Sequence, residues 1–267
     1  MVRIALLTDI HNGPDRPTRP GRVVPGLLRR FVDEMNERVR PDAVIDLGDR
    51  IDNETPQADA AHASEVALIL GELRAPVLHV RGNHDVPDGL PENPLAETQA
   101  VAPARRPGAV KLGDVTFLVL NTSDPALGGV GGSVSPEQLR TFERLLDEST
   151  GPVVILAHHP LDDHSIEGNP LFAPFPSWAF TREREALRSV IERSARVVAV
   201  FTGHVHWGSV RLVNTIPYVS VPSFLERWHE SGAAPGAYAV ATLGPGPRLR
   251  VDFRSLEAGM VVSFQHG

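Results

Sequence analysis

Residues 2–11 read VRIALLTDIH, an apolar run that closes on an aspartate and a histidine two positions apart. The run Val2–Thr8 has the composition of an apolar strand. Asp9 and His11 follow it directly. In extended backbone, residues two apart point to the same side, so this segment is predicted to deliver two polar side chains to one cavity.

The segments that follow alternate between helical and strand patterns. Apolar residues recur at helical spacing over Arg22–Arg40, and Pro41 ends that helix. Strands at Ala43–Leu47 and Val77–Arg81 flank a second predicted helix at Gln57–Leu73. An order of strand, helix, strand, helix, strand predicts parallel neighbours joined by right-handed crossovers.

The second half of the chain has a mixed pattern that becomes all-β after Val205. Ala109–Leu112 and Val115–Asn121 flank Gly113-Asp114, which is a hairpin signal. No repeat or linker interrupts the chain, so we expect one domain over residues 1–267 with mixed sheets and flanking helices. The remaining elements expected are helices at Pro136–Ser149 and Thr181–Ser194, and strands at Val153–Ala157, Arg196–Thr202, Ser209–Leu212, Tyr218–Val221, Ala237–Leu243, Arg248–Phe253 and Met260–Gln265.

The composition is that of an ordinary globular protein. The chain has 267 residues, of which 42% are hydrophobic and 22% charged, and its formal net charge is −7. No run of Lys and Arg reaches the density of a nucleic-acid patch, so no nucleic-acid polymer is expected as a partner. No apolar stretch approaches the length of a membrane span, and the N-terminal run is too short for a signal peptide. We therefore expect a soluble, cytoplasmic protein without a membrane partner.

Histidine is the one unusual count. The sequence has 11 histidines and no cysteine. Thiolate sites are therefore excluded, and any metal has to be held by oxygen and nitrogen. The placement of the histidines decides whether such a site exists.

Polar side chains follow five predicted strands at the point where each strand ends. Ligands bind beyond the carboxyl ends of the strands in open α/β sheets, so we expect these side chains to line one site. A single histidine or aspartate after a strand is more often a cap or turn residue, but that reading has to hold five times at one edge. Neighbouring glycines would allow close approach of the backbone. The five segments are Asp9-Ile10-His11, Gly48-Asp49, Gly82-Asn83-His84-Asp85, His158-His159 and Gly203-His204-Val205-His206.

This ordered set of blocks resembles the calcineurin-like metallophosphoesterase superfamily. The resemblance implies an α/β fold, a four-layer αββα sandwich of two mixed β-sheets flanked by helices, in which the part from about 207 to 265 completes the second sheet. It also implies two divalent metal ions. Carboxylate, imidazole and amide ligands suit Mn²⁺, Fe²⁺ or Fe³⁺, Zn²⁺, Ni²⁺ or Co²⁺. One ion would be bound by Asp9, His11 and His206, the other by Asn83, His158 and His204, and Asp49 would bridge them.

The resemblance implies roles for the neighbouring side chains as well. His84 would be the catalytic residue near the leaving group, as a general acid or as a donor to developing charge. Asp52 and Asp85 are expected either to hold a ligand histidine or to shape a turn or cap. His159 is expected to support a ligand or face the substrate. The histidines that match no motif are predicted to be structural or on the surface: His62, His79, His164, His229 and His266.

Hydrolysis of a phosphoester by a metal-bridging hydroxide is the activity that the resemblance implies. His158-His159-Pro160 and Pro222-Ser223 are similar to bacterial class III cyclic nucleotide phosphodiesterases, so a small phosphodiester, cyclic nucleotide or phosphomonoester is the expected substrate. Asp52 stands where purple acid phosphatases supply a tyrosine ligand, which argues against that branch. Three alternatives stay open: a non-catalytic metal-binding scaffold for protein interactions, a nucleotidase or phosphoprotein phosphatase, and a two-metal amide or ester hydrolase.

Two long loops, 86–108 and 160–180, are predicted to select the substrate. The second contains Phe172, Phe175, Trp178 and Phe180, and Trp207 follows the last histidine block. These aromatic rings could stack on a nucleobase or pack the loops onto the domain, and the packing interpretation is favoured. An exposed strand edge in the C-terminal part would allow two subunits to pair as a homodimer.

Overall fold

Two six-stranded sheets lie face to face in the part of the chain that the computed structural model describes, residues 1–85, 108–124, 130–227, 234–245 and 248–267. The strand order of the first sheet is β14-β13-β12-β1-β2-β3, in which β1 pairs parallel with β2 and antiparallel with β12. Its strands are β1 (Val2–Leu7), β2 (Ala43–Asp46), β3 (Val77–His79), β12 (Ala237–Leu243), β13 (Leu249–Ser255) and β14 (Gly259–His266).

The second sheet has the order β10-β11-β9-β8-β5-β4. Its inner strands β5, β8, β9 and β11 are parallel, and each edge strand pairs antiparallel with its neighbour. Its strands are β4 (Gly108–Leu112), β5 (Val115–Val119), β8 (Val153–Leu156), β9 (Val197–Thr202), β10 (Ser209–Val213) and β11 (Ile216–Ser220). A short pair, β6 (Ser123–Asp124) and β7 (Ser133–Val134), lies beside it.

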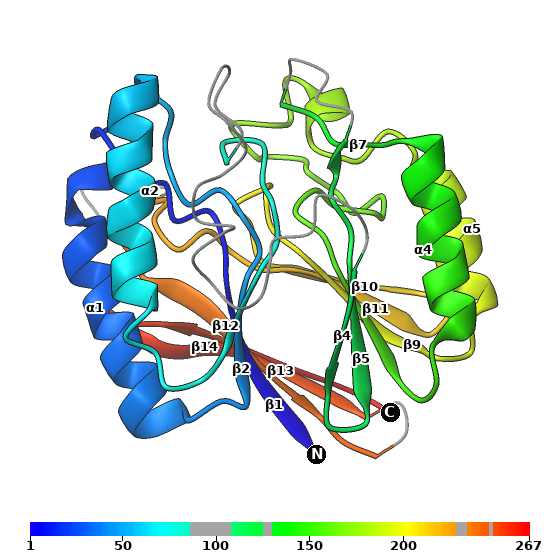
Figure 1. The fold of residues 1–267 in the computed structure, drawn as a ribbon. Helices are drawn as coiled ribbons and strands as arrows, with labels where there is room; N and C mark the ends of the chain where they lie inside the picture. The colour runs from blue at the N-terminus through cyan, green and yellow to red at the C-terminus, as the bar shows by residue number, and fades with distance from the viewer. Residues whose placement is uncertain (86–107, 125–129, 228–233, 246–247) are drawn as a thin grey trace.

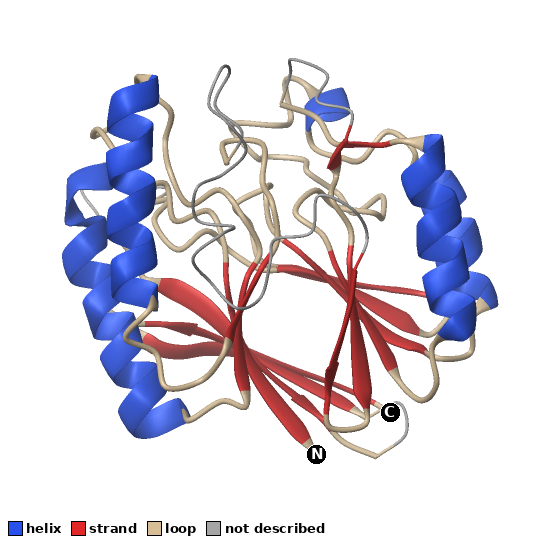
Figure 2. Cartoon of the chain, viewed as in Figure 1, coloured by secondary structure: helices blue, strands red, loops and turns tan. Residues whose placement is uncertain are grey.

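Helices cover the outer face of each sheet (Figures 1 and 2). On the first sheet lie α1 (Val24–Glu34), which continues into the π-helix η2 (Met35–Val39), and α2 (Pro56–Leu70). On the second lie α4 (Pro136–Glu148) and α5 (Arg184–Arg193). The hydroxyls of Thr55 and Ser135 cap α2 and α4, and each cap is followed by a proline that suits the first helical turn. Single turns of 3₁₀-helix occur at η1 (Gly21–Val23) and η3 (Pro176–Trp178).

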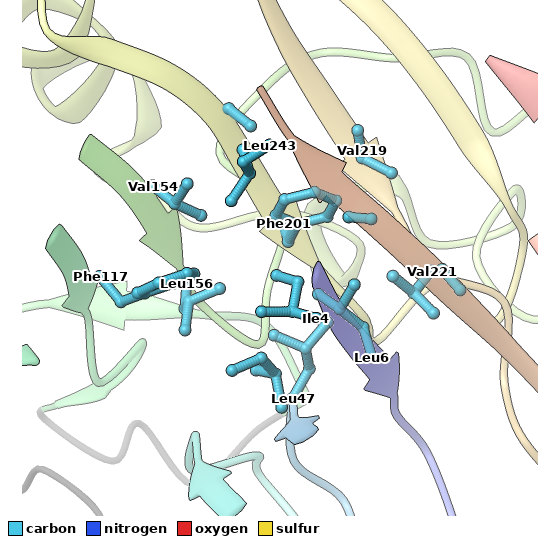
Figure 3. Close-up of a cluster of buried hydrophobic side chains, with 14 of the residues drawn as sticks. Ile4, Leu6, Leu47, Phe117, Val154, Leu156, Phe201, Val219, Val221 and Leu243 are labelled. Atoms are coloured by element: carbon cyan, nitrogen blue, oxygen red, sulfur yellow. The ribbon is translucent and has the colours of Figure 1, made fainter. Parts of the chain in front are cut away.

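Three apolar layers hold the sandwich together. Alternate residues of β1 face opposite ways, so Ile4 and Leu6 enter the core between the sheets while Ala5 and Leu7 pack under α1 and α2. Figure 3 shows the inter-sheet core, where Phe117 and Phe201 of the second sheet meet side chains of the first. Each such aromatic ring contributes roughly 1.5–3 kcal/mol when fully buried. The docked sheets therefore form a rigid base for the loops at one end.

The predicted fold class of mixed sheets flanked by helices is confirmed, but the sheet assignment of the C-terminal part was wrong. Only β10 and β11 extend the second sheet. The strands β12, β13 and β14 extend the first sheet, because β12 pairs with β1 in the register Val2↔Leu243 to Leu6↔Ala239. A strand pattern specifies which residues face a core, and it does not specify which distant strand will be the partner.

Two sequence expectations concern loops and membranes. Of the predicted substrate loop 86–108, residues 86–107 lie outside the described residues. Among the described helices, none combines the length and apolarity that crossing a membrane requires.

Candidate metal centre

The loops that leave the parallel strands of both sheets meet at one end of the sandwich (Figure 2). Backbone hydrogen bonds join these loops to one another. Asp9 N–H donates to the Gly48 carbonyl (2.9 Å), and His11 N–H donates to the Asp49 carbonyl (3.0 Å). In the second sheet, Gly203 N–H donates to the His158 carbonyl (2.9 Å). The predicted ligand blocks are thus held side by side by main-chain contacts.

The backbone at most of the predicted ligands is left-handed. Extended backbone was predicted at Asp9 and His11, and this prediction was wrong. Left-handed backbone costs roughly 1–2 kcal/mol for a residue with a Cβ, although Asp and His tolerate it better than most. These ligands therefore sit at sharp turns that the surrounding contacts impose, with φ of 52° at Asp9, 47° at His11, 57° at Asp49, 68° at His204 and 60° at His206.

Asp9, His11 and His206 form one buried cluster. Nε2 of His206 lies 3.2 Å from Nε2 of His11 and 3.2 Å from Oδ1 of Asp9, and Nε2 of His11 lies 3.8 Å from the same oxygen. The other ring nitrogen of His206, Nδ1, donates to Oε2 of Glu226 at 2.9 Å. Sequence reasoning missed Glu226, because it lies 20 residues beyond His206 in no motif.

Asp49, His158 and His204 continue the site on its other side. Oδ2 of Asp49 is 3.2 Å from Nε2 of His158 and 4.0 Å from Nε2 of His11, so this carboxylate lies between the two groups of ligands. Nδ1 of His158 donates to the Leu47 carbonyl at 2.9 Å, and Nε2 of His204 donates to the Trp178 carbonyl at 2.8 Å. These contacts leave one ring nitrogen of each histidine for a metal, as in ordinary metal sites.

Buried polar atoms without hydrogen-bond partners make this arrangement compatible with metal binding. Asp9 Oδ1, Asn83 Oδ1 and His158 Nε2 are among the buried side-chain atoms of the described residues that have no hydrogen-bond partner. Asp9 Oδ1 lies 3.2 Å from Nε2 of His206, and Nε2 of His158 lies 3.2 Å from Oδ2 of Asp49, distances that two ligands of one ion would also show. Burying an unsatisfied polar group costs about 1–3 kcal/mol, and a bound cation would remove that cost.

The two carboxylates set the electrostatics of the centre. Burial by itself would raise the pKa of Asp49 and of Asp9, but the adjacent histidines hold both below their usual range. Burial by itself would lower the pKa of both His158 and His206. The Asp49 carboxylate nevertheless raises the pKa of His158 to about 10, and the Asp9 carboxylate raises that of His206 to about 9. The buried pocket therefore attracts positive charge, whether protons or metal ions.

His84 lies at the exposed side of this cluster. Its ring stands edge-on to the His11 ring, with centroids 5.0 Å apart, and its side chain is 26% exposed, whereas the predicted Asp and His ligands are buried. Its Nδ1 lies 3.9 Å from Oδ1 of Asp52, whose other oxygen accepts from Arg16 Nε at 3.1 Å. Asp52 is thus placed beside His84, and the two form one group with the ligand histidine His11, in which the possible ligand atoms lie within 4.8 Å of one another.

Asp85 and His159 are bound to groups around the predicted ligands. The Asp85 carboxylate accepts hydrogen bonds from the backbone N–H of Gly82, Asp49 and Arg50, each at 2.9 Å, and so ties two ligand loops together. The His159 ring lies close enough to His158 and His204 to belong to a metal cluster. However, its Nδ1 is 2.8 Å from the Thr122 hydroxyl and its Nε2 donates to the Val130 carbonyl at 3.0 Å, so neither nitrogen remains for a metal.

The described histidines outside the motifs each have a partner that is not a predicted metal ligand. His79 is buried and its Nδ1 lies 2.8 Å from Oδ2 of Asp46, which also pairs with Arg50. His164 donates to Asp162 at 2.9 Å, and His62 faces Glu54 at 3.8 Å. His266 stacks on Phe264 near the C-terminus, and His229 lies outside the described residues.

Comparisons with known proteins point to one family. The model of the calcineurin-like phosphoesterase family matches residues 2–208. A cAMP/cGMP dual specificity phosphodiesterase of Mycobacterium tuberculosis is 29% identical over 204 residues, which are 73% of this chain and 58% of that protein. The DNA double-strand break repair protein Mre11 of Aeropyrum pernix is 30% identical over 176 residues, 61% of this chain and 42% of that protein. The chain thus spans about half the length of these curated relatives.

A solved structure shares the fold over the whole chain. The crystal structure of a dimetal phosphatase from Danio rerio superposes with a TM-score of 0.75 at 19% identity, and the match covers 99% of this chain and 98% of that one. At this identity the likeness concerns the fold alone.

Proposed function

We propose, since the chain belongs to the calcineurin-like phosphoesterase family, that it hydrolyses small phosphoesters at a centre of two divalent metal ions. The observation that carries the proposal is the Asp49 carboxylate between His11 and His158, surrounded by buried ligand atoms that lack hydrogen bonds. The M. tuberculosis relative is named for two cyclic nucleotides, so a small phosphodiester is the first substrate class to test.

The donor atoms divide into two ligand sets that share Asp49. Asp9, His11 and His206 would hold one ion. Asn83, His158 and His204 would hold the other. When bound, two such ions would activate a water as the nucleophile near neutral pH and would stabilise the charge on the oxygens of an in-line displacement. Oxygen and nitrogen donors without thiolate suit Mn²⁺, Fe²⁺, Zn²⁺, Ni²⁺ or Co²⁺.

The charges of the ligands favour an anionic substrate. Asp9 and Asp49 carry −1 each, whereas Asn83 is neutral and the histidines bind metal as neutral imidazoles. Two divalent ions therefore exceed the ligand charge even after a hydroxide is added. This local excess would attract a phosphoryl group although the whole chain carries a net charge of −7.

His84 would donate the proton that the leaving group needs. As the P–O bond breaks, the departing oxygen takes a proton from the imidazole, which regains one from water. The ring is the accessible histidine beside the cluster, and its Nδ1 lies 3.9 Å from Oδ1 of Asp52. General-acid catalysis of this kind contributes about 10²–10⁴ in rate.

His84→Ala tests this assignment. We expect the variant to bind two equivalents of Mn²⁺, measured by calorimetry and metal analysis, and to lose about 10²–10⁴ in kcat on bis-p-nitrophenyl phosphate. His266→Ala, at the far end of the sandwich, is the control and should keep both. Loss of metal in His84→Ala would mean that the ring supports the site and does not donate protons.

A substrate panel separates the remaining alternatives. It compares monoesters, diesters, cyclic nucleotides and a single-stranded oligonucleotide, since the Mre11 relative acts in DNA repair by its name. The acidic net charge predicts small esters over the oligonucleotide. Wild-type protein that binds two metal ions but cleaves no phosphoester would favour the non-catalytic scaffold.

A further inference from the structure

One guanidinium lies against the metal centre behind the predicted ligand His11. Nη1 of Arg19 is 3.1 Å from Nδ1 of His11. The same group lies 3.6 Å from Oδ2 of Asp52 and 3.7 Å from Oε2 of Glu226. The side chain is 21% exposed. Arg19 therefore touches a predicted metal ligand, the partner of His84 and the partner of His206 at once.

This contact sets His11 apart from the other ligand histidines. In His158, His204 and His206, one ring N–H donates a hydrogen bond to a carbonyl or carboxylate oxygen. Such acceptors keep the proton on that nitrogen and leave the other nitrogen free for a metal. His11 faces a donor instead, because a guanidinium has N–H groups and no acceptor.

Metal binding would therefore release the Arg19 donors from His11. A histidine that gives the lone pair of Nε2 to a metal carries its proton on Nδ1. Two N–H groups cannot share a hydrogen bond, so Arg19 has to turn its donors elsewhere. Asp52 and Glu226 are 3.6 and 3.7 Å away, beyond hydrogen-bond distance, so they keep the cation close without satisfying its N–H groups.

We propose that Arg19 binds the substrate by donating to phosphoryl oxygens at the ion held by Asp9, His11 and His206. This inference rests on the proposed function. The planar guanidinium matches a phosphate in a bidentate manner, which an ammonium does not. An anion between the ion and Arg19 would also remove the repulsion between two neighbouring cations. Asp52 and Glu226 then position Arg19 from the opposite side.

Inorganic phosphate is the probe that tests the proposal. The experiment titrates phosphate into Mn²⁺-loaded wild type, Arg19→Ala, Arg19→Lys and Arg22→Ala by calorimetry. A charge-assisted hydrogen bond corresponds to about a 10- to 100-fold change in affinity. We expect Arg19→Ala to bind phosphate about 10- to 100-fold more weakly and Arg19→Lys to recover part of the loss. Arg22→Ala removes an exposed cation from the same segment and should bind as wild type does.

Metal stoichiometry and turnover complete the test. All four proteins should bind two Mn²⁺, with an affinity in Arg19→Ala at least equal to that of wild type, and KM for bis-p-nitrophenyl phosphate should rise in Arg19→Ala. Equal phosphate affinity in Arg19→Ala and Arg22→Ala overturns the proposal while leaving the proposed function intact. Loss of metal in Arg19→Ala overturns it too, since the arginine would then support His11. Wild type that neither binds phosphate nor cleaves phosphoesters overturns both.

Discussion

Glycines beside the ligands decide how closely the loops can approach one another. A Cβ built on Gly82 would lie 2.8 Å from the carboxyl carbon of Asp49, and one built on Gly203 would lie 2.9 Å from Oδ2 of Asp9. Both carboxylates are predicted metal ligands. No side chain can occupy these positions without moving a ligand, which explains the two glycines in physical terms.

Gly82→Ala is expected to weaken metal binding. The added methyl group pushes Asp49 from its place between the two ligand sets, at a cost of roughly 1–3 kcal/mol in overpacking. Gly26→Ala is the matched control, because a Cβ at this position meets nothing within 4 Å. Replacing a glycine inside α1 by alanine should stabilise the protein by about 0.5–1 kcal/mol. Mn²⁺ stoichiometry and thermal unfolding of both variants provide the measurement. Two Mn²⁺ bound by Gly82→Ala with wild-type affinity would refute this account.

The residues of the motifs were accessible from sequence, but their supporting partners were not. Asp9, Asp49 and His158 could be predicted from the sequence motifs at the strand ends. Glu226 and Arg19 match no block, since their contacts with ligand histidines arise only when distant segments fold together. The left-handed backbone at the ligands was also missed, because local sequence predicts an extended continuation after a strand.

At the scale of elements, the aromatic residues of the loop between β8 and α5 include a buried ring and an exposed, stacked pair. Phe172 is buried, and its ring centroid lies 4.8 Å from that of His204. Phe175 and Trp178 are 50% and 43% exposed and stack on one another with centroids 4.5 Å apart. The Trp178 carbonyl holds His204, so the exposed ring pair begins directly beside the metal centre.

Trp178→Ala should change substrate selection without removing metal, because its bond to His204 comes from the main chain. Stacking of a base on an aromatic ring corresponds to about 1–3 kcal/mol. We expect KM for a cyclic nucleotide to rise at least about 5-fold, with little change for a dialkyl phosphodiester. Leu171→Ala, an exposed non-aromatic change in the same loop, is the control. A similar loss on both substrates, or lower stability alone, would favour the packing role.

The segment between β2 and β3 is anchored by a buried ionic group. Asp46, at the end of β2, accepts from Gly48 N–H at 3.0 Å, lies 2.8 Å from Nδ1 of His79 and pairs with Arg50. Burial by itself would raise the pKa of Asp46, but Arg50 and His79 lower it to about 2. The interaction fixes the turn from which Asp49 projects.

This pKa predicts an acid-sensitive part of the stability. The folded-state pKa of Asp46 is depressed below its ordinary value of 3.8, so the contribution of Asp46 to the free energy of unfolding is fully present above about pH 4 and is lost as pH falls toward 2. The size is about 2 kcal/mol at 1.36 kcal/mol per pKa unit. Urea unfolding in EDTA should show that the difference in free energy of unfolding between wild type and Asp46→Asn decreases by about 2 kcal/mol between pH 4 and pH 2. A gap that stays constant with pH would exclude Asp46 as its source.

At the scale of the whole molecule, the centre exists only when the two sheets are docked. The first sheet supplies Asp9, His11, Asp49 and Asn83 from the ends of β1, β2 and β3, and the second supplies His158, His204 and His206 from the ends of β8 and β9. The elements could be predicted from periodicity. The membership of β12–β14 in the first sheet could not, because pairing with β1 is a contact between the two ends of the chain.

Metal binding should therefore stabilise the docked sandwich as a unit. A ligand present at about 100 times its Kd stabilises the folded state by roughly 2.7 kcal/mol, which corresponds to a Tm rise of about 5–10 °C for a chain of this size. Mn²⁺ should raise the Tm of wild type and of Asp163→Asn, whose exposed carboxylate pairs with Arg184 and Arg188 and not with a predicted ligand. His11→Ala and His204→Ala should each lose most of this rise in Tm, although His11 follows a strand of the first sheet and His204 follows a strand of the second. If only His11→Ala loses it, the ion held by Asp9, His11 and His206 accounts for the stabilisation, and the second ligand set does not contribute to it.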